Sequence, residues 1–381
     1  MFKTSAKPLL VCFSHLRWNF VFQRPQHLLT RAAQTFDVAY FEEPLLAQGD
    51  TAFLQIARQD GIRVITPVLP QQINDTERIH VVRELIEQWL EERPIHVLWY
   101  YTPQALAFSG HLRAEAIVYD NMDELCAFRG APVELLALEK VLFRKADIVF
   151  TGGRSLFEAK KGRHPCVHCL PSSVDAEHFK AARYPVPEPE DQAPISSPKI
   201  GFFGVIDERM DVTLVEAVAK LKPDWNFVLL GPTCKIEPET LPLAPNLHWL
   251  GPKKYLELPA YIAHWDAGFM PFALNEATRF ISPTKTPEFL AAGLPVVSTP
   301  ITDVVTPYGD EGLVEIAGTP QEFVEKLFHI LAEPKERVRS RADGFLAPMS
   351  WDRTWATMLR LIEGTLAQPH RAPAKGGASH V

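Results

Sequence analysis

Hydrophobic and polar positions follow two alternating patterns along the first half of the chain. Short, continuous apolar runs are typical of strands buried on both faces of a sheet, and they alternate with segments whose apolar residues recur every three or four positions, as on one face of a helix. The predicted strands are Leu9–Phe13, Asp37–Phe41, Arg63–Thr66, Val97–Tyr100, Ala116–Tyr119, Ile148–Thr151 and Cys166–Leu170. The predicted helices are Pro25–Gln34, Glu77–Glu92 and Val133–Lys145. This order favours a parallel sheet with helices on both faces.

The pattern is interrupted once and then restarts. Residues 182–198 are rich in proline and acidic side chains and have no periodicity, which predicts an extended linker. The strands expected after it are Lys199–Phe203, Asn226–Leu230, Leu247–Leu250, Ala267–Met270, Pro295–Ser298 and Leu313–Ile316. The helices expected there are Val212–Leu221, Leu256–His264, Thr286–Ala292, Pro320–Ala332 and Ser350–Leu366.

These elements predict an α/β protein of two Rossmann-like, doubly wound domains that face a cleft. The first domain is expected over residues 1–181 and the second over residues 199–349. The tail 367–381 is small, polar and bears Pro and Gly, so we expect it to be disordered. Ligands of such sheets bind beyond the carboxyl ends of the strands, at helix N-termini, and the cleft is therefore the expected site of an anionic ligand.

The amino-acid composition limits the classes of partner that this protein is expected to bind. A length of 381 residues fits two domains, and a hydrophobic content of 46% is ordinary for a soluble protein. A net charge of −7 without a basic stripe argues against nucleic acid as a partner. No apolar run approaches the length of a membrane span, the run Leu9–Phe13 is too short for a signal peptide, and five cysteines lack a framework spacing. These features predict a cytoplasmic protein.

The first candidate site follows the strand Lys199–Phe203. Gly204 allows the backbone to approach a ligand closely, and Arg209 with the start of the next helix favours a phosphate. An ordinary strand-to-helix turn with a solvent-facing arginine explains the same residues, and the sequence does not separate the two interpretations.

The second candidate site lies at the start of a later predicted helix. Its residues are Ser282, Pro283, Thr284, Lys285 and Glu288. Backbone donors and Lys285 suit a diphosphate, and a carboxylate one turn further can accept hydrogen bonds from two ribose hydroxyls. The alternative is a capping arrangement in which the helix dipole favours Glu288.

The second half of the chain carries a family resemblance. Residues Lys285–Thr299 read K-x-x-E-F-L-A-A-G-L-P-V-V-S-T, which resembles the donor-binding segment of the retaining GT-B glycosyltransferases of family GT4, enzymes of glycolipid and polysaccharide synthesis. Leu170–Asp175 is similar to the family's turn before the linker, and Leu250–Pro252 with Tyr255 is similar to its base-binding stretch. Ser350–Asp352 is similar to the start of its final helix. The resemblance covers most of residues 9–365.

The resemblance implies a GT-B fold and a nucleotide-sugar donor, with UDP favoured over GDP, and retention at the anomeric carbon without a metal or a cofactor. It implies that helix 350–366 packs back on the first domain, that Gly204 belongs to the donor-phosphate loop and that Glu288 binds the ribose. Lys285 and Arg209 would stabilise the leaving diphosphate. The acceptor, a glycan or a lipid-linked molecule, would approach the first domain, which could then contact the inner membrane face peripherally.

Two positions depart from the family's pattern. The first glutamate of its paired-glutamate motif is replaced by Phe280, and Glu276 lies nearby but out of register. The arginine that usually follows the loop glycine is replaced by Val205. We expect the missing positive charge to come from other basic residues: Arg209, Lys285 and Arg279.

An aromatic and basic loop follows the first strand, where related enzymes have a glycine-rich acceptor loop. Aromatic faces stack on sugars, and arginine forks hold phosphate or carboxylate. The acceptor-side candidates are therefore His15, Arg17, Trp18, Arg24 and His27. A packed loop with a solvated arginine is the competing interpretation for each of them.

Asp120 follows the strand Ala116–Tyr119 and is the third catalytic candidate beside Arg209 and Lys285. We expect it to point at the cleft, where many relatives have a histidine. There it would accept a hydrogen bond from a sugar hydroxyl or stabilise positive charge at the anomeric carbon. Asp123 is either functional or a helix cap.

No metal site is expected. The spacing of Asp120, Asp123 and Glu124 mixes a strand end with a turn. The cluster His164–Cys169 alternates across a strand, which predicts core cysteines rather than ligands.

Three hypotheses follow. The leading one is a glycosyltransferase that moves a sugar from a nucleotide-sugar to a glycan or lipid-linked acceptor. A UDP-sugar epimerase or a phosphorylase shares the fold, but the acid–base carboxylates or the lysine-bound cofactor that they require are not clear in the sequence. A non-catalytic or divergent nucleotide-sugar-binding protein is favoured by Phe280 and Val205.

Overall fold

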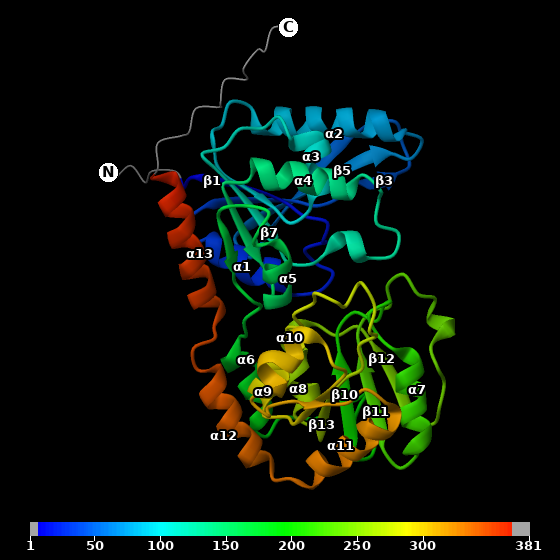
Figure 1. Cartoon of the computed structure of the whole chain (residues 1–381). Coiled ribbons are helices and arrows are strands. Elements are labelled where there is room, and N and C mark those ends of the chain that lie inside the picture. The colour runs from blue at the N-terminus through cyan, green and yellow to red at the C-terminus, as the bar shows by residue number, and fades with distance from the viewer. Residues whose placement is uncertain (1–6, 368–381) are drawn as a thin grey trace, which may run out of the picture.

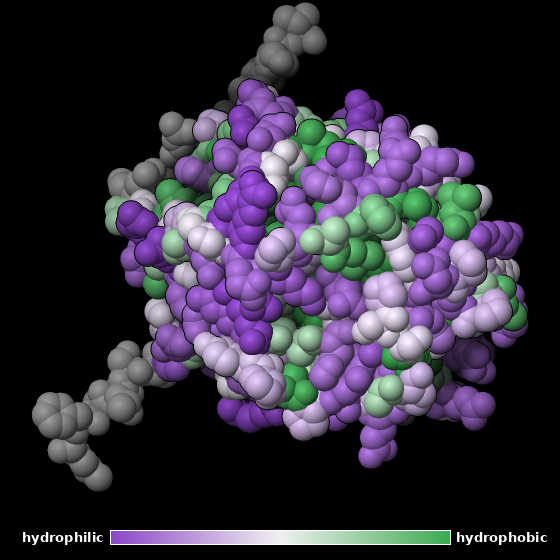
Figure 2. All heavy atoms as spheres, turned by 90° about the horizontal axis from the view of Figure 1, so that it is seen from below, coloured by the Kyte–Doolittle hydropathy of each residue, from purple (hydrophilic) through white to green (hydrophobic). Residues whose placement is uncertain are grey.

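The computed structural model describes residues 7–367, which form two domains, one above the other in Figure 1. Residues 368–381 of the tail that we expect to be disordered lie outside the described residues. No helix within residues 7–367 combines the length and the hydropathy needed to cross a membrane. Seen from below, the side of the C-terminal domain, hydrophilic residues cover most of the surface, and apolar residues gather in a few small areas (Figure 2).

The N-terminal domain is built on one sheet with the strand order β3-β5-β2-β1-β6-β7-β8-β9, and β4 pairs with β5. All of its pairs are parallel except β4 with β5. The strands are β1 (Leu9–Phe13), β2 (Asp37–Phe41), β3 (Leu45–Ala47), β4 (Phe53–Gln59), β5 (Ile62–Pro70), β6 (Ile95–Tyr100), β7 (Ala116–Asn121), β8 (Ile148–Thr151) and β9 (Val167–Cys169). The helices in this part of the chain are α1 (Arg24–Ala32), α2 (Asp75–Leu90), α3 (Leu106–Ser109), α4 (Leu135–Lys145), α5 (Arg154–Lys160) and α6 (Ala176–Lys180).

Both faces of this sheet are covered, which explains why its central strands read as continuous apolar runs. Residues of α2 and α4 pack on one face with Val11, Phe13 and Phe41. Residues of α1 and of the last helix, α13 (Trp351–Leu366), pack on the other face with Leu10 and Tyr40. Helix α13 thus returns from the C-terminal domain to the N-terminal sheet (Figure 1).

The C-terminal domain repeats this plan with a sheet of order β12-β11-β10-β13-β14-β15, all parallel. Its strands are β10 (Lys199–Phe203), β11 (Asn226–Leu230), β12 (Leu247–Gly251), β13 (Ala267–Met270), β14 (Val296–Ser298) and β15 (Glu315–Ile316). Its helices are α7 (Val212–Leu221), α8 (Leu258–Ile262), α9 (Lys285–Ala292), α10 (Thr302–Val304), α11 (Pro320–Ala332) and α12 (Lys335–Leu346). Helices α7 and α11 cover one face, and α6, α8, α9 and α12 cover the other.

The chain crosses between the domains earlier than residue 181. Val174 and Phe179 are buried in the C-terminal core, so α6 belongs to the C-terminal domain in space. The predicted linker 182–198 begins with a helical turn at Ala181–Arg183, and its later residues pack on the C-terminal domain instead of extending into solvent. Gln192 is fully buried, donates to the carbonyl of Tyr261 at 3.1 Å and accepts from the Trp265 indole at 2.8 Å.

Helix α12 and strand β4 are elements that we do not predict, and β4 forms a hairpin with β5, of which only Arg63–Thr66 is predicted. The turn residues of this hairpin, Asp60 and Gly61, both have positive φ, +52° and +80°, as a two-residue hairpin turn requires. An Asp-Gly pair between two apolar stretches is typical of such a turn, so the sequence does contain the pattern that predicts it.

Candidate functional site

Gly204 and Lys285 lie against each other where β10 ends. The φ of Gly204 is +134°, and a Cβ atom there would lie 2.2 Å from Cε and 2.4 Å from Nζ of Lys285. Gly231, directly after β11, packs on Gly204 so closely that a Cβ atom at Gly231 would lie 1.8 Å from the Gly204 carbonyl oxygen. Two glycines therefore make room for the lysine. Gly231 is a site residue that sequence reasoning missed, although its place after a buried strand matches that of Gly204.

Lys285 is the first residue of α9, and its ammonium lies over two aromatic rings. Nζ is 5.4 Å from the ring centre of Phe202 and 5.9 Å from that of Phe272. No carboxylate among residues 7–367 forms an ion pair with it within 4.0 Å. Burial, followed by the charge of Arg209, lowers the pKa of Lys285 to about 8, although Glu288 acts in the opposite direction. The ammonium is thus poorly neutralised by the protein.

Glu288 lies one turn further along α9 and is 5% exposed. Burial raises the pKa of its carboxyl group to about 7, while Lys285 and a hydrogen bond from Thr284 lower it. The hydroxyl of Tyr255 is buried and has no hydrogen-bond partner among the described residues. Burial and the charge of Glu288 raise the pKa of Tyr255. This half of the site holds polar groups whose hydrogen bonds are incomplete.

Arg209 is held rigidly beside the same site by its neighbour Asp207. The guanidinium donates to the carboxylate with Nε–Oδ1 at 3.0 Å and Nη2–Oδ2 at 2.6 Å, and the arginine side chain is 26% exposed. Burial acts to lower the pKa of Arg209, but the hydrogen bond and charge of Asp207 outweigh it and raise the pKa. Arg209 is therefore charged and held in one orientation, and the negative charge of Asp207 partly neutralises its positive charge.

Arg209 and Lys285 line one cavity of about 100 Å³ between the domains. The C-terminal residues around it include the remaining predicted phosphate-site residues, Ser282, Pro283 and Thr284. The N-terminal domain contributes Gln23, Arg24, Met122, Asp123 and Ser172. The structure thus brings most of the predicted donor residues together and adds Arg24, which we expect on the acceptor side. Glu288 lies behind Lys285, outside this lining.

Asp120 does not point at the cleft, which corrects the expectation from the sequence. Its carboxylate is fully buried and accepts from Arg24 through Nε at 2.9 and 3.1 Å and through Nη2 at 2.8 Å. Arg24 also donates from Nη1 to the carbonyl of Leu170 at 2.9 Å. Asp120 therefore orients Arg24 and cannot contact a sugar in this conformation.

Three other acceptor-side candidates turn inward, and this too corrects the expectation. Trp18 is 4% exposed, and its indole donates to Asp60 at 3.2 Å. His27 stacks on Trp351 with ring centres 4.5 Å apart, and burial, then Arg31, lowers its pKa to about 3. Arg17 holds Glu42 at 3.2 Å and two main-chain carbonyls. Packing explains these residues: the side-chain donors of Trp18 and Arg17 find partners in the β4–β5 turn and after β2, and His27 packs on Trp351.

His15 stays at the cleft. It is half-buried, and its Nδ1 has no hydrogen-bond partner among the described residues. Burial and then Lys235, a residue of the C-terminal domain, lower the pKa of His15 to about 4, so the imidazole is neutral at pH 7.

The loop after β7 crosses to the C-terminal domain, which no sequence pattern predicts. The backbone N–H of Arg129 donates to both carboxylate oxygens of Glu208 at 3.0 and 3.2 Å. The ring of Phe128 lies 5.5 Å from the guanidinium of Arg209 and 5.6 Å from the ammonium of Lys235. These contacts close one end of the cleft. They join residues about 80 or more positions apart, which explains why local patterns do not reveal them.

Other candidates lie elsewhere. Arg279 pairs with Glu276 at 3.5 Å on the surface, so neither supplies charge to the cavity. In the cluster His164–Cys169, the cysteines are half-buried and not in the core as expected, and Cys166 Sγ lies 3.3 Å from Nε2 of His168. No group of three or more His, Cys, Asp or Glu side chains with the geometry of a metal site occurs within residues 7–367.

Sequence relatives exist for parts of the chain. Residues 197–333 match the family model described as Glycosyl transferases group 1. Over 222 residues the chain is 29% identical to TuaH of Bacillus subtilis (strain 168), whose name describes a teichuronic acid biosynthesis glycosyltransferase. The match covers 53% of this chain and 55% of that protein, so the chain spans about half the length of this relative.

Solved structures share the architecture over almost the whole chain. Sucrose-phosphate synthase from Thermosynechococcus elongatus has a TM-score of 0.71 at 14% identity and covers 95% of this chain and 100% of its own. An E. coli structure described as trehalose-6-phosphate bound with UDP-2-fluoro glucose has a TM-score of 0.68 at 13% identity and covers 95% and 100%. Anabaena HepE in complex with UDP has a TM-score of 0.66 at 14% identity and covers 94% and 100%. These likenesses show the fold, and they confirm the predicted pair of Rossmann-like domains of GT-B type.

Proposed function

We propose that this chain, whose residues 197–333 match the family model of the glycosyl transferases group 1, is a glycosyltransferase with a nucleotide-sugar donor. The observation that carries the proposal is the ammonium of Lys285, seated on Gly204 without a carboxylate partner and lining a cavity with Arg209 and Arg24. Lys285 and Arg209 bring positive charge to this small cavity in a chain whose net charge is −7, whereas the charge of Arg24 is neutralised by Asp120. A diphosphate is the anion that such a site suits.

The donor that we propose is a UDP-sugar in preference to a GDP-sugar. Its diphosphate would lie against Lys285 and the N-terminus of α9, and Glu288 would accept hydrogen bonds from the ribose. Two structures of the same fold are described as complexes with UDP or a UDP-sugar, which supports this choice. The nucleotide-sugar is a substrate, and the proposed reaction needs no further cofactor.

The proposed transfer proceeds with retention at the anomeric carbon. The bond between that carbon and the diphosphate oxygen breaks while the bond to the acceptor oxygen forms on the same face. The acceptor proton passes to the departing diphosphate. Lys285 and Arg209 stabilise the negative charge that develops on the leaving group, and they would do so without a metal ion. The contacts of the loop after β7 help to exclude water from the cleft.

A panel of UDP- and GDP-sugars tests this proposal on the full chain. We expect UDP and one UDP-sugar to raise the melting temperature and slow nucleotide release to occur from that sugar. Nucleotide release that accelerates with a hydroxylated acceptor would establish transfer. No stabilisation by any nucleotide would overturn the proposal.

A non-catalytic nucleotide-sugar-binding protein is the second candidate. The observation that favours it is Phe280, which replaces the glutamate expected to read the donor sugar, with Glu276 and Arg279 paired on the surface. Stabilisation by UDP without turnover of any donor would support this candidate.

The cellular role that we propose is synthesis of a surface polysaccharide. It rests on the likeness of about half of the chain to a protein named for teichuronic acid biosynthesis. The acceptor would then be a glycan or a lipid-linked glycan. The cytoplasmic location and the peripheral membrane contact expected from the sequence stay predictions.

A further inference from the structure

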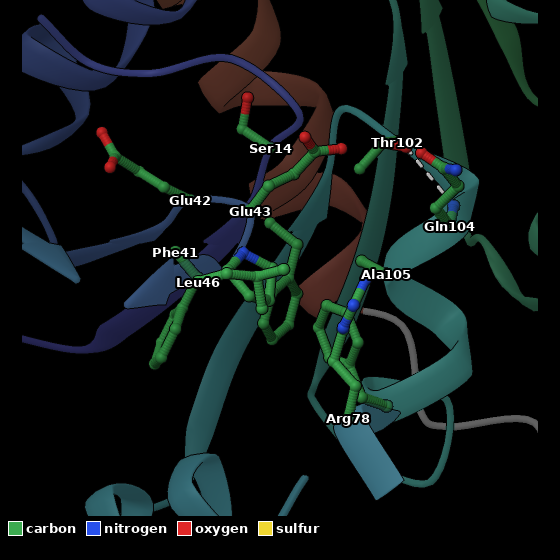
Figure 3. Close-up of a pocket in the computed structure, with 12 residues that line it drawn as sticks. Ser14, Phe41, Glu42, Glu43, Leu46, Arg78, Thr102, Gln104 and Ala105 are labelled. Atoms are coloured by element: carbon green, nitrogen blue, oxygen red, sulfur yellow. Dashed lines mark hydrogen bonds between the residues drawn. The ribbon is translucent and has the colours of Figure 1, made fainter. Parts of the chain in front are cut away.

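A second cavity lies in the N-terminal domain, beyond the carboxyl ends of β1, β2 and β6 (Figure 3). Its volume is about 280 Å³. Side chains at this edge of a doubly wound sheet are placed to meet a ligand. None of the five acceptor-side residues predicted from the sequence lines it.

The floor of this cavity is aromatic. The ring of Phe13 lies 5.3 Å from that of Phe41 and 5.7 Å from that of Phe108, and all three residues line the cavity. An apolar floor with a few polar groups at the rim is the usual construction of a small-molecule site. A sugar ring, with apolar C–H faces and polar edges, fits this construction.

One end of the cavity bears the carboxylate of Glu43, an exposed residue whose side chain has no hydrogen-bond partner within residues 7–367. Glu42 is used internally, because it accepts from the backbone of Trp18 at 2.7 Å and from Thr66 at 2.7 Å. Glu43 offers only its main-chain carbonyl to Arg17. Figure 3 shows the carboxylate of Glu43 near Ser14 and Thr102. This end could therefore bind sugar hydroxyls.

Burial raises the pKa of Glu43, while Arg17 and Lys235 lower it, and Lys235 belongs to the C-terminal domain.

The other end of the cavity bears Arg78, from the first turns of α2. Its Nε is buried and has no hydrogen-bond partner among the described residues. Among the described residues it forms one ion pair, with Asp75 at 3.4 Å, and this pair is weak because the arginine side chain is 36% exposed and the carboxylate 93%. Figure 3 shows the guanidinium extending from α2 toward Ala105. A buried guanidinium N–H without a partner favours an anionic ligand.

We propose that this cavity holds the acceptor of the proposed transfer, a hydroxylated sugar that carries an anionic group. The hydroxyl to be glycosylated lies at the Glu43 end, and a carboxylate or phosphate at the opposite end is held by Arg78. This inference rests on the proposed function, since it names the class of acceptor.

Three probe sugars test the assignment on the full chain saturated with UDP: glucose, glucuronic acid and glucose 6-phosphate. Calorimetry should show that one or both of the anionic sugars bind about ten- to a hundredfold more tightly than glucose. The comparison of glucuronic acid with glucose 6-phosphate shows whether the site prefers a carboxylate or a phosphate. The substitution Arg78→Gln should abolish this preference by weakening the binding of the anionic sugars toward that of glucose, and Arg78→Lys should restore part of it.

Arg83 provides the matched control. It lies on the same helix, is 48% exposed and pairs with Glu87 at 2.9 Å, so Arg83→Gln should retain the preference. Equal binding of the three sugars by the unmodified chain, or an unchanged preference in Arg78→Gln, would overturn the inference. UDP binding distinguishes failure of the acceptor inference from failure of the proposed function. If UDP binds but the anionic sugars bind no more tightly than glucose, only the acceptor inference fails. If UDP does not bind, the proposed function fails.

Discussion

Two acid–base pairs lie on opposite sides of the cleft, one fully buried and one made of a half-buried lysine and a buried glutamate, and they differ in how fully their charges are neutralised. In the N-terminal domain, Arg24 and Asp120 are 1% and 0% exposed and share three hydrogen bonds of 2.8–3.1 Å. In the C-terminal domain, Lys285 and Glu288 stand one turn apart and form no ion pair within 4.0 Å. Burial lowers the pKa of Lys285 and raises that of Glu288, so both groups are pushed toward their neutral forms.

The difference separates a structural pair from a ligand-binding one. Asp120 satisfies Arg24, and removing either partner would leave a buried charge. Lys285 and Glu288 lack such compensation, which an anionic ligand with hydroxyl groups would supply. Burial alone therefore does not mark function; the incomplete satisfaction of the buried charge does.

The largest expected effect is on the stability of the N-terminal pair. Asp120→Ala leaves the guanidinium of Arg24 buried and unpaired, which should lower the free energy of unfolding by about 3–5 kcal/mol. Denaturant unfolding of the full chain measures this. The control is Asp352→Ala, since Asp352 is 80% exposed and pairs with Arg31, and it should cost less than about 1 kcal/mol. Equal effects of the two substitutions would remove the contrast between the pairs.

The C-terminal pair should respond in the opposite way. Lys285→Gln removes a poorly neutralised charge, so stability should change by less than about 1 kcal/mol, whereas UDP affinity should fall by about ten- to a hundredfold. Calorimetric titration with UDP measures the affinity. Lys220→Gln, at a 66% exposed position on α7, is the matched control and should bind UDP normally. Unchanged UDP affinity in Lys285→Gln would show that the phosphate assignment is wrong.

A smaller effect is expected from the glycine that seats the lysine. The Cβ atom of Gly204→Ala would lie 2.2 Å from Lys285 Cε, so the ammonium must move by rotation of a flexible side chain. UDP affinity should fall by about three- to tenfold, less than in Lys285→Gln, because the charge is displaced but not lost. Gly130→Ala, where a Cβ atom meets nothing within 4 Å and φ is also positive, controls for backbone strain. A larger loss at Gly130 would contradict this explanation.

Sequence reasoning predicted the fold closely and the C-terminal site in part. The central strands and the residues around Lys285 can be predicted from short stretches of sequence. Buried parallel strands need continuous apolar runs, and the residues that begin a helix occupy fixed positions relative to its first turn. The loop after β1 misled us, because His, Arg and Trp side chains serve packing as readily as binding. Arg24 shows the limit: its partner Asp120 lies 96 positions away, and nothing local links the two. The cavity at Arg78 is not predicted from the sequence because its residues come from four separate segments.

Proton exchange on UDP binding tests most directly the claim that Lys285 is an unsatisfied cation awaiting a diphosphate. With a pKa of about 8, lowered by burial, most of the Lys285 amine is neutral at pH 9, and an anion that binds beside it should restore the charge. Calorimetry in buffers of different ionisation enthalpy should then show uptake of close to one proton per UDP at pH 9 and much less at pH 7.5, where the phosphates of UDP are already ionised. Affinity should fall as the pH rises through about 8, and Lys285→Arg should abolish both effects. UDP binding without proton uptake at pH 9 would contradict the account.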